Sequence, residues 1–435
     1  MNSTVNSTVN SAVNSAVNST VNSAVNSAVN STVNAIGKAG TALAAELSSL
    51  RRELHQNPEL SLQEHGTAAM IADLLAKMGC EVQTNVGGTG VVGILRNGGD
   101  SPAIALRADI DALPIAEETG SNYASKNPGV MHACGHDAHM TCLIGAMQIL
   151  AQHRECWQGT VKAIFQPAEE IVIGAEAMIQ ESVLENPKVD WVFGLHVQPD
   201  LEVGKVGVKE GPLMAAADVF SIKIKGCGGH GAYPHLIRDP IMGAAAVVMN
   251  LQTLISRSRN PLEPGVLSIG TIQGGTQHNI IPEEVELTGT VRTYDTRLRT
   301  DMEAWIRRIV SGTVAALDLT AEVGYLRGVI PVNNHPEAAR IAVNAVRNAV
   351  GTQALAAAVP VMGSEDFALF LEKASGCLLW LGIRNEAAGI VHPWHSPRFD
   401  IDERALPIGA SVLAQCVVEA CSYHVKLKEY GRFGR

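Results

Sequence analysis

The order of apolar runs and amphipathic segments constrains the fold of this chain more than any other feature. Four short apolar runs are typical of buried strands. They lie at residues 90–97, 101–115, 159–170 and 190–199. Segments with helical periodicity alternate with them, at residues 40–60, 67–80, after His136 and at 174–184. This alternation predicts an α/β fold with a mixed, mostly parallel sheet and helices on both faces.

The pattern changes near Asp218, where a second set of elements begins. A strand, a helix, two strands, a helix and a strand are expected in that order. They lie at residues 218–226, 239–257, 265–275, 284–295, 299–317 and 320–328. The β-α-β-β-α-β order predicts a ferredoxin-like split βαβ unit. We therefore expect a catalytic domain in two parts, residues 35–217 and 329–423, interrupted by an inserted domain at 218–328.

Two terminal segments fall outside this plan. Residues 1–34 repeat Asn-Ser-(Thr/Ala)-Val, a pattern whose period of four matches neither a helix nor a well-buried strand. Its composition predicts a disordered, low-complexity tail. Residues 424–435, "HVKLKEYGRFGR", are basic, and we expect them to form a loose tail.

Charge and cysteine usage narrow the class of protein. The net charge of −10, with both signs interspersed, argues against a nucleic-acid binder. Eight scattered cysteines without a CxxC pair favour a reducing compartment over a disulfide framework. No continuous apolar run of about 18 residues and no secretion signal are evident, so we expect a cytoplasmic protein with no membrane partner.

Residues of metal-ligand type lie at the ends of several expected strands. The stretch "MHACGHDAH" at 131–139 offers Cys134 and His136, which would fill only two coordination positions. Further candidates follow other strands or lie near the C-terminus: Glu169, Glu170, His196, His392 and His395. Thiolate, imidazole and carboxylate together suit zinc, manganese or cobalt, whereas calcium and magnesium prefer all-oxygen sites.

Each candidate also has a purely structural explanation. Cys134 could be a small buried apolar residue, and His196 a hydrogen-bonded core histidine. Asp137 could cap the following helix, and the two glutamates could be first-turn acids favoured by the helix dipole. The adjacent carboxylates favour catalysis, because a hydrolytic metal site needs one ligand and one base that moves a proton.

Eight sequence motifs occur in this chain in the same order as in a known protein family. They are "MHACGHDAHM", "FQPAEE", "GLHV", "GGHGAYPH", "GTIQGGTQHNIIP", "GTVRTYD", "MGSEDFA" and "HSPRFDIDE". Between about Ala35 and Ala420 the chain resembles the M20 metallopeptidases. It is most similar to the branch with hippurate hydrolases, N-acyl-amino-acid amidohydrolases, indole-3-acetyl-amino-acid hydrolases and carboxypeptidases.

The resemblance implies a set of roles. The implied metal ligands are Cys134, His136, Glu170, His196 and His395, holding divalent transition ions (Mn, Zn or Co), two per subunit. Glu169 would be the general base, and Asp109 would steady the site. His230 would reach the substrate carbonyl, in several relatives across a dimer interface. Asn279 and Arg292 match positions associated with substrate binding.

Two departures and two rival functions accompany this interpretation. Gln277 and His278 stand where relatives more often carry small residues, and Arg107 occupies the place of a histidine ligand found in other branches. The expected substrate is an N-acyl amino acid or short peptide, and the expected assembly is a homodimer formed through the inserted domain. A dipeptidase or carboxypeptidase of the same fold is the nearer alternative. A metal-binding homologue without catalysis is the other, and it would not need the second glutamate.

Overall fold

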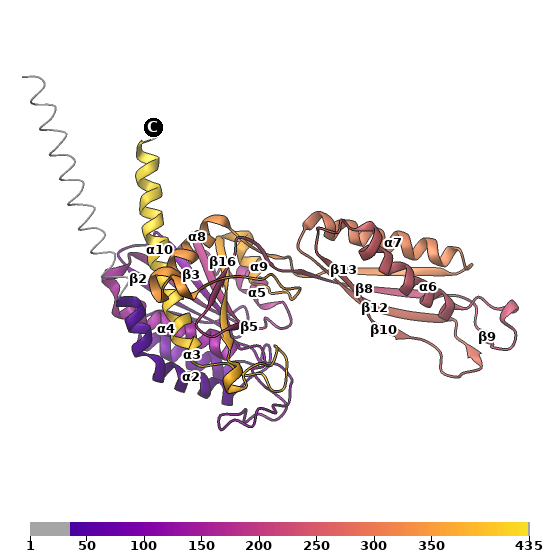
Figure 1. The fold of residues 1–435 in the computed structure, drawn as a ribbon, viewed down its shortest axis with the longest axis horizontal. Coiled ribbons are helices and arrows are strands. Elements are labelled where there is room, and N and C mark those ends of the chain that lie inside the picture. Colours follow the sequence, from indigo (N-terminus) through magenta and orange to yellow (C-terminus); the bar gives the residue numbers. More distant parts are fainter. Residues whose placement is uncertain (1–34, 434–435) are drawn as a thin grey trace, which may run out of the picture.

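Two large β-sheets, each with its own helices, dominate the computed structural model, which describes residues 35–433 (Figure 1). The expected tail at 1–34 lies outside these residues. The larger sheet has eight strands in the order β1-β2-β4-β3-β5-β16-β6-β15. The strands are β1 (Glu81–Val86), β2 (Gly90–Asn97), β3 (Ala103–Asp109), β4 (Gly159–Gln166), β5 (Trp191–Glu202), β6 (Val206–Val208), β15 (Leu355–Ala357) and β16 (Ser375–Arg384).

The strand directions place the candidate metal ligands that follow β4 and lie on β5 at one edge of this sheet. Strands β4, β3, β5 and β16 run parallel to one another at its centre, whereas β1 and β2 pair antiparallel at one side. The carboxyl ends of the central strands therefore meet at a common edge, where ligands bind in such sheets. The prediction of a mixed, mostly parallel sheet is confirmed.

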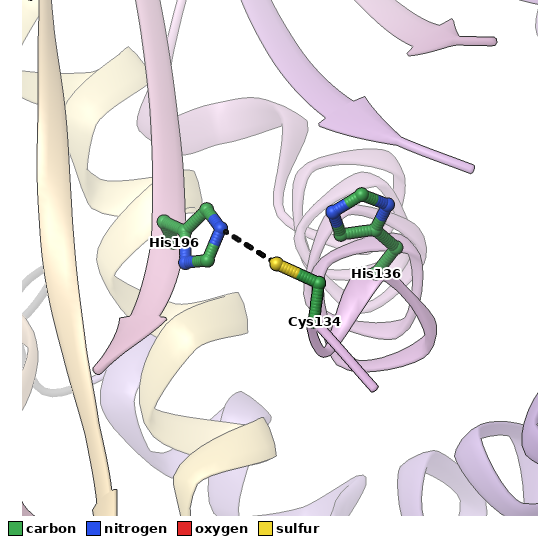
Figure 2. Close-up of side chains that lie close together, drawn as sticks. All are labelled: Cys134, His136 and His196. Atoms are coloured by element: carbon green, nitrogen blue, oxygen red, sulfur yellow. Dashed lines mark hydrogen bonds between the residues drawn. The ribbon is translucent and has the colours of Figure 1, made fainter. Parts of the chain in front are cut away.

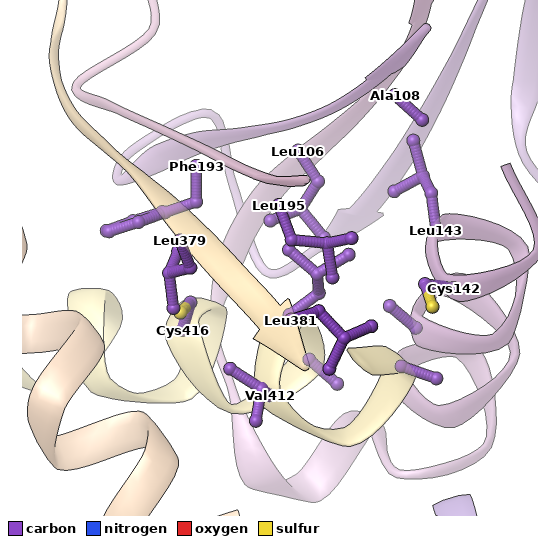
Figure 3. Packing of buried hydrophobic residues seen from close by; sticks show 14 of the residues in the cluster. Leu106, Ala108, Cys142, Leu143, Phe193, Leu195, Leu379, Leu381, Val412 and Cys416 are labelled. Atoms are coloured by element: carbon purple, nitrogen blue, oxygen red, sulfur yellow. The ribbon is translucent and has the colours of Figure 1, made fainter. Parts of the chain in front are cut away.

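Helices cover both faces of the large sheet because its central strands are apolar on both sides. Leu106 and Phe193 point into one buried cluster, and the neighbouring Ala105 and Val192 into the other. The first cluster lies under α2 (Ala44–Gln56), α4 (His136–Gln152), α8 (Pro336–Val350) and α10 (Ala405–Phe433), and Figure 3 shows part of it. The second packs against α5 (Gly174–Gln180) and α9 (Phe367–Lys373), while α3 (His65–Lys77) lies beside β1 and β2.

The inserted domain extends from this body as an arm (Figure 1). Its four antiparallel strands are ordered β10-β12-β8-β13, which is the ferredoxin-like arrangement expected from the sequence. The strands are β8 (Ala216–Lys225), β10 (Gly265–Gln273), β12 (Glu284–Thr293) and β13 (Thr320–Arg327). Helices α6 (Pro240–Thr253) and α7 (Thr296–Ala315) cover one face and share a separate apolar core with the sheet.

Two short pairings were not expected. Strand β9 (Gly229–His230) pairs with β11 (Ile280–Ile281) at the end of the arm farthest from the large sheet (Figure 1). Strand β7 (Gly211–Met214) pairs with β14 (Val332–Asn334) where the chain enters and leaves the arm. Next to this junction the buried Asp218 accepts hydrogen bonds from Arg299 Nε (3.0 Å), the Tyr325 hydroxyl (2.8 Å) and the Gly328 amide (3.1 Å).

The prediction of a loose basic tail is wrong as far as Phe433, because α10 continues through these residues. The segment contains Lys, Leu and Glu, which favour helix, and no proline interrupts it. Residues 405–426 of α10 are also long and apolar enough to cross a membrane, but 78 % of the most apolar stretch is buried inside the protein. Packing against α4 and α8 accounts for that apolar character.

Candidate active site

Five implied metal ligands lie together at the carboxyl edge of the large sheet. Cys134 precedes α4, His136 is its first residue, and His196 lies on β5. Figure 2 shows Cys134 between the two imidazoles, with its sulfur directed at His196. Glu170 follows β4, and His395 belongs to the loop after β16. The His395 amide donates to the Ala133 carbonyl (2.9 Å), which places this C-terminal loop beside Cys134.

Gly135 permits the close approach of Cys134 and His136 to β5. Its φ of +89° lies in the left-handed region, and a Cβ there would lie 2.4 Å from Val197 Cγ2. Glycine alone meets both requirements.

The donor atoms are spaced as ligands of shared ions. Cys134 Sγ lies 3.6 Å from His196 Nε2, and Glu170 Oε2 lies 3.6 Å from His395 Nε2. His136 Nε2 is 3.8 Å from Glu170 Oε1. Ligands about 2.0–2.3 Å from one zinc-type ion lie roughly 3–4 Å apart, so these separations fit coordination.

In the two buried histidines among the candidate ligands, His136 and His196, hydrogen bonding of Nδ1 leaves Nε2 directed at the site. His136 Nδ1 donates to the Asp111 carbonyl (2.8 Å), and His196 Nδ1 donates to the Val197 carbonyl (2.8 Å). His136 Nε2 and Glu170 Oε1 are buried and have no hydrogen-bond partner among the residues that the structure describes. Buried polar atoms normally have one, so a cation is the partner that these residues fit.

His139, from the same segment, lies close by but differs from the candidate ligands in its hydrogen bonding. Its Nδ1 faces Asp109 Oδ1 at 2.6 Å, and its Nε2 accepts the Val197 amide at 2.9 Å. Both nitrogens are therefore occupied. Asp109, in addition, accepts from Arg107 Nη1 at 2.8 Å, so this carboxylate joins β3 to α4 behind the ligands.

Asp111 is a residue that the sequence analysis missed. Its carboxylate accepts the backbone amides of both Glu169 and Glu170 (3.1 Å each) and the Ser61 hydroxyl (2.7 Å). Its carbonyl orients His136. One buried residue thus holds both glutamates and one histidine. The only local signal was a second aspartate, two residues after Asp109.

The alternative structural roles can now be compared with the geometry. Helix α5 begins at Gly174, so the two glutamates lie in the preceding loop rather than in a helical first turn. Asp137 binds Arg51 Nε (2.8 Å) and His55 Nδ1 (2.6 Å) on α2, and these contacts fix the start of α4.

Negative charge accumulates around the ligands. Burial raises the pKa of Glu169 well above its usual value, and the nearby carboxylates of Glu365, Glu170 and Asp366 add to this effect. Burial likewise raises the pKa of Glu170 to about 7, against the opposing effect of His136. A divalent cation would relieve this repulsion and favour ionised ligands.

A cavity of ≈ 950 Å³ opens over the ligands. Its lining includes Cys134, Glu169, Glu170, His196 and His395 from the body, and Arg292 from the inserted domain. Arg292 Nη1 donates to the Ser364 hydroxyl at 3.0 Å across the two domains.

The other two predicted residues of the inserted domain lie elsewhere. His230 is on β9 and Asn279 immediately precedes β11, at the far end of the arm (Figure 1). The Asn279 carbonyl accepts a hydrogen bond from the Gly231 amide at 2.9 Å. Because Gly231 directly follows His230, Asn279 and His230 lie close together at this end. Neither lines the cavity.

Comparison with known proteins identifies the family. The model of peptidase family M20/M25/M40 matches residues 105–419. The chain belongs to this family. The resemblance inferred from the eight motifs is confirmed, and the chain is a metal-dependent hydrolase.

Three similar proteins illustrate the range of this family. Thermostable carboxypeptidase 2 of Saccharolobus solfataricus is 40% identical, over 83% of this chain and 92% of its own. N-acetyl-L-cysteine deacetylase of Bacillus subtilis is 41% identical, over 84% and 86%. The solved structure of the Bacillus subtilis YXEP protein, described as a dinuclear metal binding peptidase of the M20 family, has a TM-score of 0.78 and 38% identity, over 88% and 99%.

Proposed function

We propose that this protein hydrolyses the amide bond of N-acyl amino acids in the cytoplasm, with two divalent transition ions and Glu169 as general base. The observation that carries the proposal is the placement of the two glutamates. Both backbones are held by Asp111, yet Glu170 faces His136 and His395 with separate oxygens, whereas among the described histidines Glu169 comes within 4 Å of His136 alone, at 3.9 Å. Coordination and proton transfer can therefore be divided between them.

Two of the candidate donor groups in the described residues support a pair of ions. Cys134, His136 and His196 form one group of donor atoms, and Cys134, Glu170 and His395 form another. Cys134 belongs to both groups, so its thiolate would help to hold either ion. Such ions acidify the attacking water and polarise the scissile carbonyl.

The chain's own residues would supply the remaining steps. Glu169 takes a proton from the attacking water and returns it to the departing amine, a role that its position in the lining of the cavity beside His136 allows. Arg292 has no carboxylate partner within hydrogen-bonding distance in the described residues and would pair with the carboxylate of the substrate.

A homodimer formed through the inserted domain would complete the site. Strand β10 is at an edge of its sheet, and Met242 and Met249 are exposed on α6. Edge strands and exposed apolar residues favour association of two copies. The second copy would then deliver His230 to the substrate carbonyl.

Metal removal and a substrate panel test the proposal. Protein stripped with a chelator and dialysed should lose amide hydrolysis, and manganese, zinc or cobalt should restore it. The panel is hippurate, N-acetyl amino acids and dipeptides. Faster cleavage of dipeptides than of every N-acyl amino acid would favour the carboxypeptidase or dipeptidase alternative. Full activity of metal-free protein would contradict the mechanism.

A further inference from the structure

Residues 171–173, which directly follow the two glutamates, form an aliphatic turn of sequence Ile-Val-Ile. Val172 has a φ of +59° and is the only β-branched residue with a positive φ in the described part of the chain. Its amide donates to the Glu169 carbonyl at 2.8 Å, closing the turn. A β-branched residue is a clear outlier in this region, where glycine would be unstrained. Retained strain of this kind is typical of functional sites.

The aliphatic turn also leaves apolar surface exposed at the active site. Ile171 is 51% exposed, and both Ile171 and Val172 line the cavity that contains the metal ligands. Ile173 is 45% exposed but is not part of the lining.

The inserted domain contributes a matching apolar surface to the same cavity. Val219 on β8 and Leu326 on β13 are register partners, so their side chains lie side by side on one face of the sheet. They are 52% and 68% exposed, and both line the cavity. Exposed aliphatic residues gathered from two domains at one cavity indicate an apolar ligand.

We propose that the substrate carries a large apolar group, in its acyl portion or its amino-acid side chain, and that Ile171 and Val172 determine the preference for it. This inference rests on the proposed hydrolysis of N-acyl amino acids. The proposal explains why a valine stands at position 172 despite its strained backbone. Glycine would relax the backbone there, but it would remove part of the apolar wall of the cavity. One methylene in such a pocket changes discrimination by about 10- to 200-fold.

Two substrate pairs measure the preference and identify which portion is recognised. N-benzoylglycine against N-acetylglycine varies the acyl group, and N-acetylphenylalanine against N-acetylalanine varies the side chain. For Ile171→Ala and Val172→Gly we expect the ratio of kcat/KM, large over small, to fall at least about 10-fold in one pair. Ile173→Ala is the matched control and should leave both ratios unchanged.

Stability separates this role from a structural one. Val172→Gly removes the strain, so its Tm should equal or exceed that of the wild type while its preference for the large substrate falls.

Unchanged ratios in both variants, with the wild type active, overturn the inference but not the proposed function. Inactivity of the wild type toward every N-acyl amino acid overturns the proposed function. Calorimetric binding of N-benzoylglycine and N-acetylglycine to manganese-loaded protein then still tests the apolar preference. Equal affinities in the wild type and both variants would contradict it.

Discussion

The two ends of the inserted domain differ in what they offer the active site. The near end contributes Arg292, Val219 and Leu326 to the cavity over the candidate metal ligands. The far end carries His230 and Asn279 on an exposed two-stranded tip. Strand β8 alone, ten residues long, separates the ends by about 33 Å.

This distance limits what domain closure can achieve. The junction near Asp218 and Gly328 is beside the cavity, because Ala217 and Gly328 line it. A rotation about that junction keeps the tip at the same distance from it. His230 therefore cannot reach the ligands of its own chain by hinge motion, whereas Arg292 is already there. We therefore propose that the residues implied by the resemblance fall into two classes: Arg292 would act within its own chain, whereas His230 would need a second copy.

The largest effect is expected at the cavity. Glu169→Gln should keep its metal and lower kcat by about 10²–10⁴-fold, because the amide cannot take up the proton. Glu170→Gln should lose both metal and turnover. Metal content is measured by atomic spectroscopy beside the rate. Equal metal loss in the two variants would contradict the division of roles.

The tip should matter for catalysis but not for metal binding. His230→Ala should lower kcat by about 10²–10³-fold with unchanged metal content, since it removes a donor to the developing oxyanion. Mixing His230→Ala with Glu169→Gln subunits should restore about a quarter of wild-type activity, because half of the random dimers would have one intact site. Each variant remixed with itself is the control. No recovery after verified subunit exchange would exclude action across subunits.

The buried junction should control the stability of the arm. Asp218→Ala leaves Arg299, the Tyr325 hydroxyl and the Gly328 amide without their shared acceptor. Breaking a buried ion pair costs about 3–5 kcal/mol, so amides of β8 and β13 should exchange hydrogen faster while those of β5 stay protected. Lys225→Gln, at the exposed far end of β8, should leave exchange unchanged. Equal effects of the two substitutions would contradict the contrast.

A smaller effect is expected from the residue that supports the glutamates. Asp111→Asn replaces one accepting oxygen by a donor, so one of the Glu169 and Glu170 amides loses its partner. Metal affinity should fall about 10- to 100-fold, as for other residues that orient ligands. Ser61→Ala removes only the hydroxyl contact and serves as control. Titration with manganese measures both, and an unchanged affinity in Asp111→Asn would contradict the supporting role.

The sequence by itself determined the class of fold and the chemistry of the site. Apolar runs that alternate with helical periodicity specify two covered faces, because neighbours such as Ala105 and Leu106 must be buried on opposite sides. Cysteine, histidine and paired glutamates at strand ends indicated a transition-metal site with a catalytic base, and the resemblance carried by the eight ordered motifs implied a metal-dependent hydrolase. Their grouping at one edge follows from parallel strands.

Only the tertiary structure decided which residues act together. Asp111 and Asp109 are alike in sequence, but the side chain of Asp111 meets the loop after β4, whereas that of Asp109 meets Arg107 and His139. The strain at Val172 cannot be inferred from its residue type, because its backbone dihedrals depend on the closed turn. Arg292 and His230 are 62 residues apart on one small domain, yet an extended strand places them at opposite ends. Contacts between distant segments depend on packing and register, which no local pattern encodes.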